Sequence, residues 1–187
     1  MSEAIMPEEG SDHQATASLR LVSQPPDDAA ILAAQRNEHS GQARLAYEVA
    51  LDHLGKLAHI HGLGWHYWDG ARWAPDRGET KRAVLATARR IRADAKKMPN
   101  SSDFEKKMRA ARFKSAEGCE SAAKIEGILK IAATLPGIRM LEADADPWSL
   151  NVANGTLDLR TLTLRPHDPA NAFTKVTRAA YDPTATA

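Results

Sequence analysis

The stretch that decides the class of fold is ETKRAVLATARRIRADAKKM, residues 79–98. Its apolar side chains recur at steps of three and four residues, so they form one stripe on a helix: Val84, Ala88, Ile91, Ala95 and Met98. Seven of the other fifteen positions carry Lys or Arg. The pattern predicts an amphipathic helix that packs one side into a core and presents a basic surface on its other sides.

Two more helices are predicted downstream by the same spacing. Pro99 ends the first helix, and Ser102 or Asp103 caps the next, over residues 104–116. A third helix is expected over residues 120–135, before a Pro-Gly pair. The side chains that it turns inward are Ile125, Ile128, Leu129, Ala132 and Leu135.

The part of the chain before residue 62 is expected to be a tail followed by two helices. Residues 1–26 are rich in Ser, Glu, Ala and Pro and show no periodicity, which predicts a disordered tail. An aspartate, Asp27 or Asp28, caps a short helix, and Ser40 caps a longer one that runs to about His61. The apolar face of the longer helix consists of Tyr47, Ala50, Leu51, Leu54, Leu57 and Ala58.

Two segments show the patterns of β-hairpins. In WHYWDGARW, residues 65–73, two aromatic runs flank Asp69-Gly70, which favours a two-residue type I′ turn. Near the C-terminus, Asn154-Gly155 predicts a second such turn. The strands expected there are 148–153, 156–160 and 162–166, with 173–178 as a candidate fourth. The fold class is therefore α+β: mainly a helical bundle, with an aromatic β-hairpin and a small C-terminal β-meander.

Composition restricts the class of protein. The chain of 187 residues has one cysteine, Cys119, which excludes a disulfide within it, and its apolar runs fall short of the roughly 18–20 residues that span a bilayer. We therefore expect a cytoplasmic protein without a membrane partner. The net charge of +1 conceals a separation: residues 1–40 carry −5, whereas residues 81–114 carry +9.

The basic block predicts contacts with the phosphates of DNA, because Lys and Arg along helix faces release counterions without reading sequence. The alternative is an ordinary solvated helix surface. Eleven side chains are the expected DNA-binding residues: Lys81, Arg82, Arg89, Arg92, Lys96, Lys97, Lys106, Lys107, Arg109, Arg112 and Lys114. Arg90 belongs to the same block, but it lies about 100° around the helix from Arg89.

Other motifs point away from catalysis. The chain has no GxxxxGK[ST] phosphate-binding loop, so we expect no ATPase activity, and GxSxG, HExxH and CxxC are absent too. Asp144 and Asp146 form the Asp-x-Asp pair that polymerases use for two metal ions, but the following proline favours a solvated loop. The crowded histidines lack an accepted ligand spacing: His53, His59, His61 and His66. No catalytic residue, metal or cofactor is expected.

Four aromatic side chains of the first hairpin are candidates for stacking on unpaired bases: Trp65, Tyr67, Trp68 and Trp73. Alternate residues of a strand point to opposite faces, so some of these rings must belong to the core. We expect Trp65 and Trp73 to be packing residues.

The C-terminal sequence resembles that of phage and plasmid primase–helicases, the poxvirus-type class of superfamily 3 helicases. The resemblance rests on DADPWSLNVANGTLDLRT (144–161), LRPHDPA (164–170), TKVT (174–177) and YDP (181–183). It covers residues 62–187, and the WDGARW hairpin and the basic helix fall in the family's order. Phe113 stands where the family pattern has Trp.

The resemblance implies a domain that directly precedes the helicase motor, with residues 27–61 as a separate helical segment before it. The family continues into its Walker motifs shortly after the Tyr-Asp-Pro, so either an excised domain or a relative without a motor is expected. The implied function is a non-catalytic module of replication that binds DNA, assists helicase assembly, or both. Its partners would be DNA and a motor or further copies of itself. The alternatives are a protein-interaction collar that does not contact DNA and a metal-dependent primase.

Overall fold

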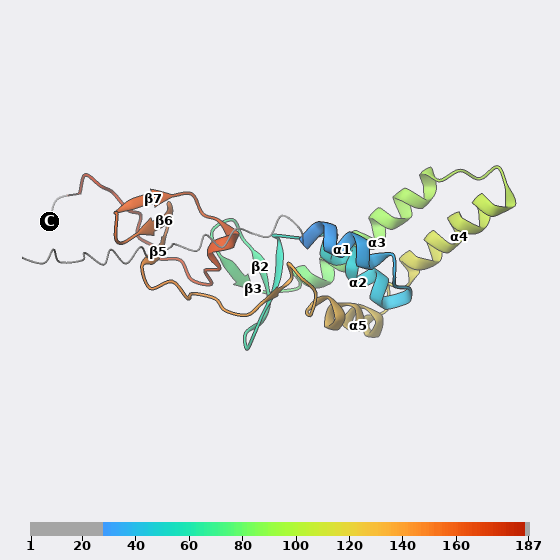
Figure 1. The fold of residues 1–187 in the computed structure, drawn as a ribbon, viewed down its shortest axis with the longest axis horizontal. Helices are drawn as coiled ribbons and strands as arrows, with labels where there is room; N and C mark the ends of the chain where they lie inside the picture. Colours follow the sequence, from blue (N-terminus) through green and yellow to red (C-terminus); the bar gives the residue numbers. More distant parts are fainter. Residues whose placement is uncertain (1–27, 186–187) are drawn as a thin grey trace, which may run out of the picture.

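The computed structural model describes residues 28–185, so the tail expected over residues 1–26 lies outside the described part. Figure 1 shows an elongated molecule in which the helices gather at one end and a three-stranded sheet lies at the other. A four-stranded sheet lies between them. The mixed α+β class expected from the sequence is confirmed.

The helical end is built from five α-helices: α1 (Asp28–Arg36), α2 (Gly41–Asp52), α3 (Glu79–Lys97), α4 (Asp103–Glu117) and α5 (Ala122–Ala132). Four of the five residues of the stripe predicted for α3 are buried, and Val84, Ala88 and Ile91 meet side chains from α1, α2 and α5 in one core. The fifth, Met98, follows the end of the helix and is half-buried. Fully buried members of this core include Leu32, Val49, Val84, Ile91 and Ile128. The predicted bounds of α3 and α4 are confirmed. The segment between the two helices contains a strong helix breaker and a helix cap, which mark the boundary in the sequence.

The prediction of one helix from Ser40 to about His61 is wrong. The helix α2 ends at Asp52, and after a turn through Gly55, whose φ is +69°, the chain enters strand β1 (Leu57–Ile60). A short apolar run fits a helix and a strand equally well by periodicity. Here the tertiary structure decides, because β1 pairs on both sides and its backbone is satisfied by neighbouring strands.

The first sheet has the order β3-β2-β1-β4. Strands β2 (Gly64–Trp68) and β3 (Trp73–Pro75) form the expected aromatic hairpin, and β4 (Arg139–Met140) runs parallel to β1. The division expected between residues 61 and 62 falls between β1 and β2, which are paired antiparallel. The N-terminal helices and the rest of the helical end therefore share one core.

The turn of the aromatic hairpin differs from the expected type I′ turn. Trp68 pairs with Trp73, which leaves the four residues 69–72 in the loop. The Asp69 carboxylate accepts hydrogen bonds from the backbone N–H groups of Ala71 and Arg72, both at 2.9 Å. A side chain thus replaces the backbone carbonyl that closes a two-residue turn. Gly70 has φ +102°, so it still requires a residue without a Cβ.

Gly70→Val is expected to lower the free energy of unfolding by about 1–3 kcal/mol, because valine is strained at positive φ. Open space surrounds the position, so the cost comes from the backbone alone. Ala71→Val is the matched control, since Ala71 has no positive φ and receives the same side chain. Thermal denaturation measures both. Equal melting temperatures for the two variants would contradict the strained loop.

The second sheet is the expected β-meander, with β5 (Ser149–Val152), β6 (Gly155–Asp158) and β7 (Thr163–Arg165) in sequence order. Its first turn lies one residue earlier than predicted, because Val152 pairs with Gly155 and only residues 153–154 form the loop. Gly155 is instead a strand residue, where a Cβ would collide with the backbone oxygen of Arg165.

The candidate strand over residues 173–178 is not formed. The Phe173 carbonyl accepts from Trp73 N–H at 2.7 Å, and Thr177 N–H donates to the Asn151 carbonyl at 2.9 Å. One end of the segment therefore bonds to the first sheet and the other end to the second. In a regular β-ladder, consecutive backbone hydrogen bonds go to the same partner strand. The bonds of this segment go to two different sheets, so it links the sheets without forming a strand in either. A short 3-10 helix, η1 (Pro169–Asn171), precedes it.

Candidate nucleic-acid interface

Helices α3 and α4 lie side by side and project beyond the other helices as an arm, residues 79–117, called the α3–α4 arm below (Figure 1). A capping box at the start of α4 stabilises the point where the chain reverses direction between the two helices. The Ser102 hydroxyl accepts from Glu105 N–H at 3.2 Å, and the Glu105 carboxylate accepts from Ser102 N–H at 2.8 Å. The arm therefore has a defined tip.

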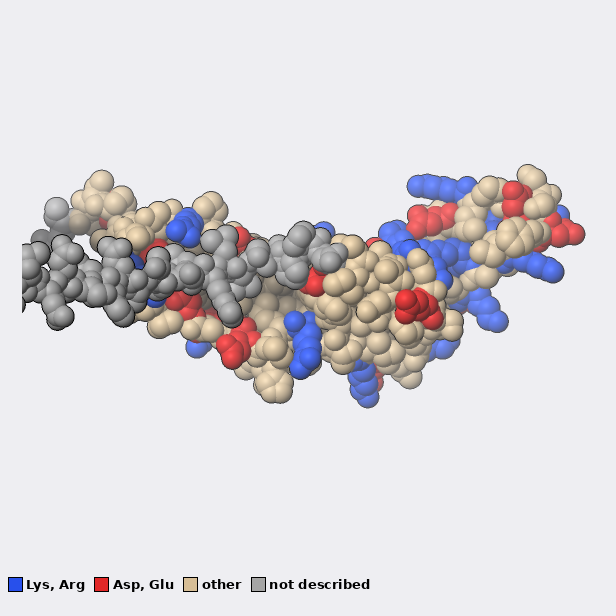
Figure 2. All heavy atoms as spheres, viewed as in Figure 1, with Lys and Arg blue, Asp and Glu red and all other residues tan. Residues whose placement is uncertain are grey.

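The outer face of α3 is basic along its length. Arg82, Arg89 and Lys96 are seven residues apart, which is close to two full turns, so they form one row opposite the buried stripe. Lys107 and Lys114 repeat this spacing on α4. In Figure 2 the blue side chains of Lys and Arg gather over the end of the molecule formed by α3 and α4. The arm thus collects the positive charge that the whole-chain total conceals.

The expected DNA-binding residues differ in whether an acid neutralises them. Three pair with exposed or partly exposed acids: Arg82 with Glu79, Arg92 with Glu120 and Lys106 with Asp103. Within residues 28–185, seven make no ion pair: Lys81, Arg89, Lys96, Lys97, Lys107, Arg109 and Lys114. Arg109 lies over the ring of Phe113, 5.8 Å from its centroid. Seven cations thus retain charge that a phosphate can neutralise.

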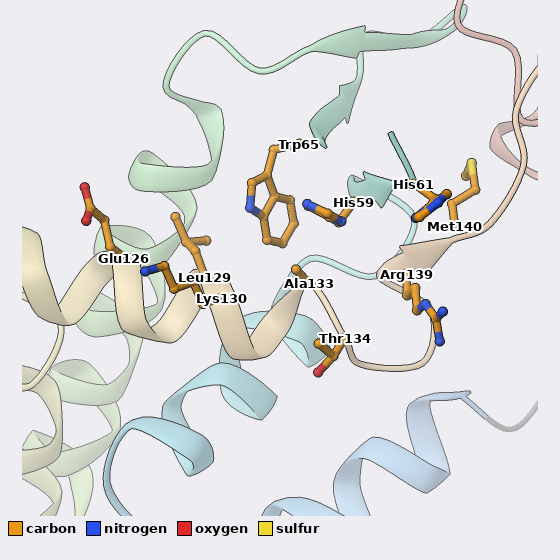
Figure 3. A pocket seen from close by; sticks show the side chains of 10 residues that line it. All are labelled: His59, His61, Trp65, Glu126, Leu129, Lys130, Ala133, Thr134, Arg139 and Met140. Atoms are coloured by element: carbon orange, nitrogen blue, oxygen red, sulfur yellow. The ribbon is translucent and has the colours of Figure 1, made fainter. Parts of the chain in front are cut away.

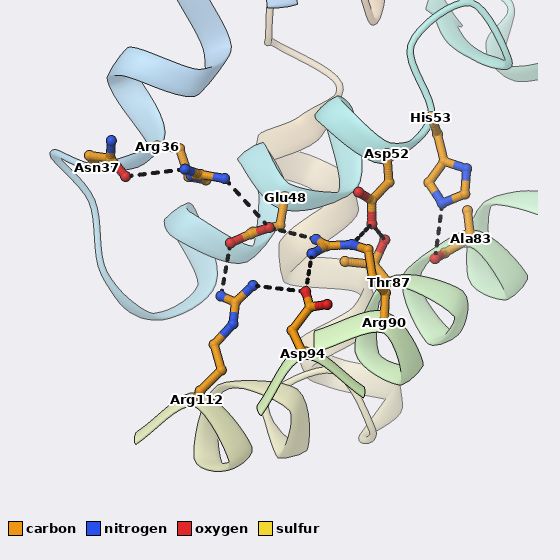
Figure 4. Close-up of polar contacts among 10 residues, drawn as sticks. All are labelled: Arg36, Asn37, Glu48, Asp52, His53, Ala83, Thr87, Arg90, Asp94 and Arg112. Atoms are coloured by element: carbon orange, nitrogen blue, oxygen red, sulfur yellow. Dashed lines mark hydrogen bonds and ion pairs between the residues drawn. The ribbon is translucent and has the colours of Figure 1, made fainter. Parts of the chain in front are cut away.

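Arg112 points into the protein (Figure 4). Its Nη1 donates to Oε1 of Glu48 at 2.9 Å, and its Nη2 lies 3.9 Å from Asp94. Arg90 makes three bonds in the same network, to Glu48 at 2.6 Å, to Asp52 at 2.7 Å and to Asp94 at 2.9 Å. Both arginines hold α2 against the arm, and acidic side chains already pair with their guanidinium groups.

Glu48 is the centre of this network, and its side chain is 3% exposed. Burial by itself raises the pKa of its carboxyl, but hydrogen bonds from Arg112 and Arg90 outweigh burial and hold the pKa below the ordinary value. Hydrogen bonds to Asp52 and Glu48 raise the pKa of Arg90 further above its ordinary value, against the effect of its own burial. Glu48 is therefore ionised at neutral pH.

Two cations outside the basic block join it in the folded chain. Arg44 on α2 and Lys124 on α5 line a hollow of about 350 Å³ together with Lys114. Neither cation makes an ion pair within the described residues. Nothing in their own sequence neighbourhoods identifies them, because only the packing of α2 and α5 against α4 brings them together.

The two carboxylates of the Asp-x-Asp pair accept hydrogen bonds from neighbouring loop segments. The Asp144 carboxylate accepts from Thr174 N–H at 2.8 Å and from the Thr174 hydroxyl. The Asp146 carboxylate accepts from Trp148 N–H at 3.0 Å and from the Ser149 hydroxyl at 2.6 Å. The bonds from Ser149 and Trp148 lower the pKa of Asp146. Both carboxylates thus act as loop anchors, in agreement with the solvated loop that the proline favours.

The four crowded histidines do not form one site, although His59 and His61 line the same hollow. His66 is buried and its Nδ1 lies 3.0 Å from the Gly64 carbonyl, whereas Nε2 of His53 lies 3.3 Å from the Ala83 carbonyl on α3. No group of three or more His, Cys, Asp or Glu side chains within residues 28–185 could hold a metal ion. Cys119 is buried, and burial raises the pKa of its thiol.

The aromatic rings of the first hairpin have different surroundings. Trp73 is 3% exposed and its indole N–H donates to the Pro169 carbonyl at 2.9 Å, so it is a packing residue, as expected. The Trp68 ring meets it edge to face at 5.7 Å. Trp65 packs against the main core but remains half-buried and lines a separate hollow.

No helix within the described residues is long and apolar enough to cross a membrane. Among curated proteins, none matches the chain. The family model described as D5 N terminal like matches residues 45–187, which begin within α2 and make up more than half of the chain. That model describes a domain N-terminal to the motor and not the motor itself. The chain belongs to the D5 N-terminal-like family, whose domain is found at the N-terminus of phage and plasmid primase–helicases.

Proposed function

We propose that the chain binds DNA non-specifically through the outer face of the α3–α4 arm, as a non-catalytic module of a phage or plasmid primase–helicase of superfamily 3. The observation that carries the proposal is the set of seven cations on a projecting element that make no ion pair within residues 28–185, six of which are exposed. Contacts with DNA phosphates need positively charged side chains that project from the protein and are exposed to solvent, and the arm provides them. Family membership makes replication the setting.

Charge reversal on the arm tests the proposal. The triple variant Lys81→Glu, Arg89→Glu and Lys96→Glu changes only exposed side chains of α3 that have no acid partner in the described part. We expect affinity for duplex and single-stranded DNA to fall at least about tenfold at low salt. The slope of log affinity against log salt should also flatten, by about 0.9 on duplex for each lost phosphate contact. Fluorescence anisotropy over a salt series measures both.

The choice of positions depends on the ion pairs. Arg92 is left out because it pairs with Glu120, and Arg90 is unsuitable as a comparison because it holds Glu48 in place. The matched control reverses three exposed cations of the C-terminal region instead: Arg165, Lys175 and Arg178. This control has the same net charge as the arm variant. Equal losses in both variants would contradict the arm as the binding surface, and so would a wild-type chain that does not bind DNA at low salt.

The second candidate function, a protein contact in helicase assembly, is favoured by the tip of the arm. Phe104 is 71% exposed and Met108 is 47% exposed, so large apolar side chains stand in solvent there. The salt series separates the two functions. Apolar contacts persist or strengthen as salt rises, whereas phosphate contacts weaken.

A further inference from the structure

A hollow of about 610 Å³ lies between α5 and the first sheet (Figure 3). His59 and Trp65 line it from β1 and β2, Leu129 and Lys130 from α5, and Arg139 from β4. Its size is typical of a small-ligand pocket. It lies outside the α3–α4 arm, and none of the expected DNA-binding residues lines it.

Trp65 supplies a large flat surface in this hollow. The His59 ring meets it at 78° with the ring centroids 5.3 Å apart, and no ring within residues 28–185 stacks parallel to the indole. Leu129 adds an apolar wall from α5. An aromatic face beside apolar side chains is the arrangement on which unpaired bases stack.

Positive charge flanks the indole on two sides. In Figure 3, Lys130 and Glu126 lie to the left of the Trp65 ring and Arg139 lies to its right. Both cations are exposed, and neither makes an ion pair in the described part of the chain. Together they outnumber Glu126, the one acid among the lining residues. A nucleotide within a DNA strand has the same arrangement, because a phosphate lies on each side of its base.

We propose that the hollow binds an unpaired nucleotide of single-stranded DNA, with its base on Trp65 and its two flanking phosphates at Lys130 and Arg139. The inference deepens the proposed function and rests on it, because it takes DNA as the partner. Duplex DNA does not fit, since its bases are stacked between neighbours and cannot enter a pocket. A free nucleotide carries phosphate on one side only and would leave one cation without a partner.

Trp65→Leu tests the stacking contact in the full chain. Anisotropy with a labelled oligothymidylate should show affinity lower by about 5- to 150-fold, the loss expected for one stacked base. Affinity for a duplex of the same length should not change. Trp148→Leu is the matched control, because Trp148 is an exposed tryptophan at the other end of the molecule, in the C-terminal β-region. Equal losses in the two variants, or an unchanged affinity in Trp65→Leu, would overturn the proposal.

Lys130→Ala with Arg139→Ala tests the phosphates independently of the core, because both side chains are exposed and neither makes an ion pair within residues 28–185. The salt slope on single strands should flatten by about 0.7 for each lost contact, while the slope on duplex stays the same. An unchanged slope on single strands overturns the assignment of these cations. So does equally tight binding of thymidine monophosphate and a thymidine trinucleotide to the wild type.

The two proposals fail separately. If the arm variant loses DNA binding while both pocket variants bind single strands like the wild type, the pocket is wrong and the arm stands. If the pocket variants lose single-strand binding while the arm variant binds normally, the arm is wrong and the pocket stands.

Discussion

Glu48→Gln is expected to lower the free energy of unfolding by about 3 kcal/mol, because it removes the only full negative charge among residues 28–185 that both Arg90 and Arg112 reach within 3.0 Å. The glutamine keeps the size of the side chain but leaves two guanidinium groups at the core without this partner. We take the lower end of the range for a broken buried pair, since Arg90 and Arg112 are 37% and 21% exposed and regain some water. Urea denaturation measures the change.

The cost of Glu48→Gln should depend on pH. The pKa of Glu48 in the folded protein lies below its ordinary value of 4.5, so the folded state binds the proton less readily than the unfolded chain. The carboxylate's stabilisation is therefore fully present above about pH 4.5 and is lost as the pH falls through the folded pKa. The difference between wild type and variant should narrow below that pH. A difference that stays constant from neutral to acid pH would contradict the role of the charge.

Glu120→Gln provides the control for this prediction. Glu120 also pairs with an arginine, Arg92, but both side chains are well exposed. Exposed pairs typically contribute about 0–1 kcal/mol, so this variant should be close to wild type. A cost as large as that of Glu48→Gln would mean that burial of the pair is not what matters.

Asn151→Asp is expected to destabilise the protein by about 3 kcal/mol or more, although the two side chains have nearly the same shape. The buried Asn151 amide donates to the Ala71 carbonyl at 2.9 Å and to the Lys175 carbonyl at 2.8 Å. Its oxygen lies 2.9 Å from Nδ1 of His167. An aspartate would place a carboxylate oxygen against two carbonyl oxygens and leave both without a donor.

The effect of Asn151→Asp should reach both sheets, because Ala71 belongs to the hairpin loop of the first sheet and Asn151 to β5 of the second. Asn171→Asp is the control, since Asn171 is exposed and the one side-chain bond that it makes within the described residues, to Thr156, is long at 3.4 Å. Thermal denaturation by circular dichroism measures the two variants. A melting temperature for Asn151→Asp as high as that of Asn171→Asp would contradict Asn151 as the link.

Local patterns predicted most of the elements. The stripe through Val84 and Ile91 predicted α3, and a cap at Ser102 or Asp103 predicted the start of α4, where Ser102 is the cap. The residue types at the turns located both hairpins, but they misplaced the turns by one or more residues. In the first loop, the Asp69 side chain takes the place of the backbone carbonyl that closes a two-residue turn. In the second, the close approach of Arg165 makes Gly155 a strand residue. These causes are contacts, which periodicity does not contain.

Strand β1 shows that periodicity can also fail to predict the type of a whole element. The sequence LAHI (57–60) extends the apolar spacing of α2, and a left-handed Gly55 is compatible with either a helix or a strand after it. The pairing of β1 with β4 joins segments about eighty residues apart in sequence. A strand of this length has no stability of its own, so its neighbours determine its conformation.

Arg89 and Arg90 separate what the sequence determined from what the tertiary structure decided. The sequence by itself determined that both lie on an amphipathic helix within a block of strong positive charge, because helical period and charge are properties of the local chain. It did not determine which of them pairs with an acidic side chain. Arg89 faces solvent, whereas Arg90 reaches Glu48, which lies 42 residues earlier in the chain. An ion pair depends on the distance between its charges, and only the packing of α2 against α3 sets that distance.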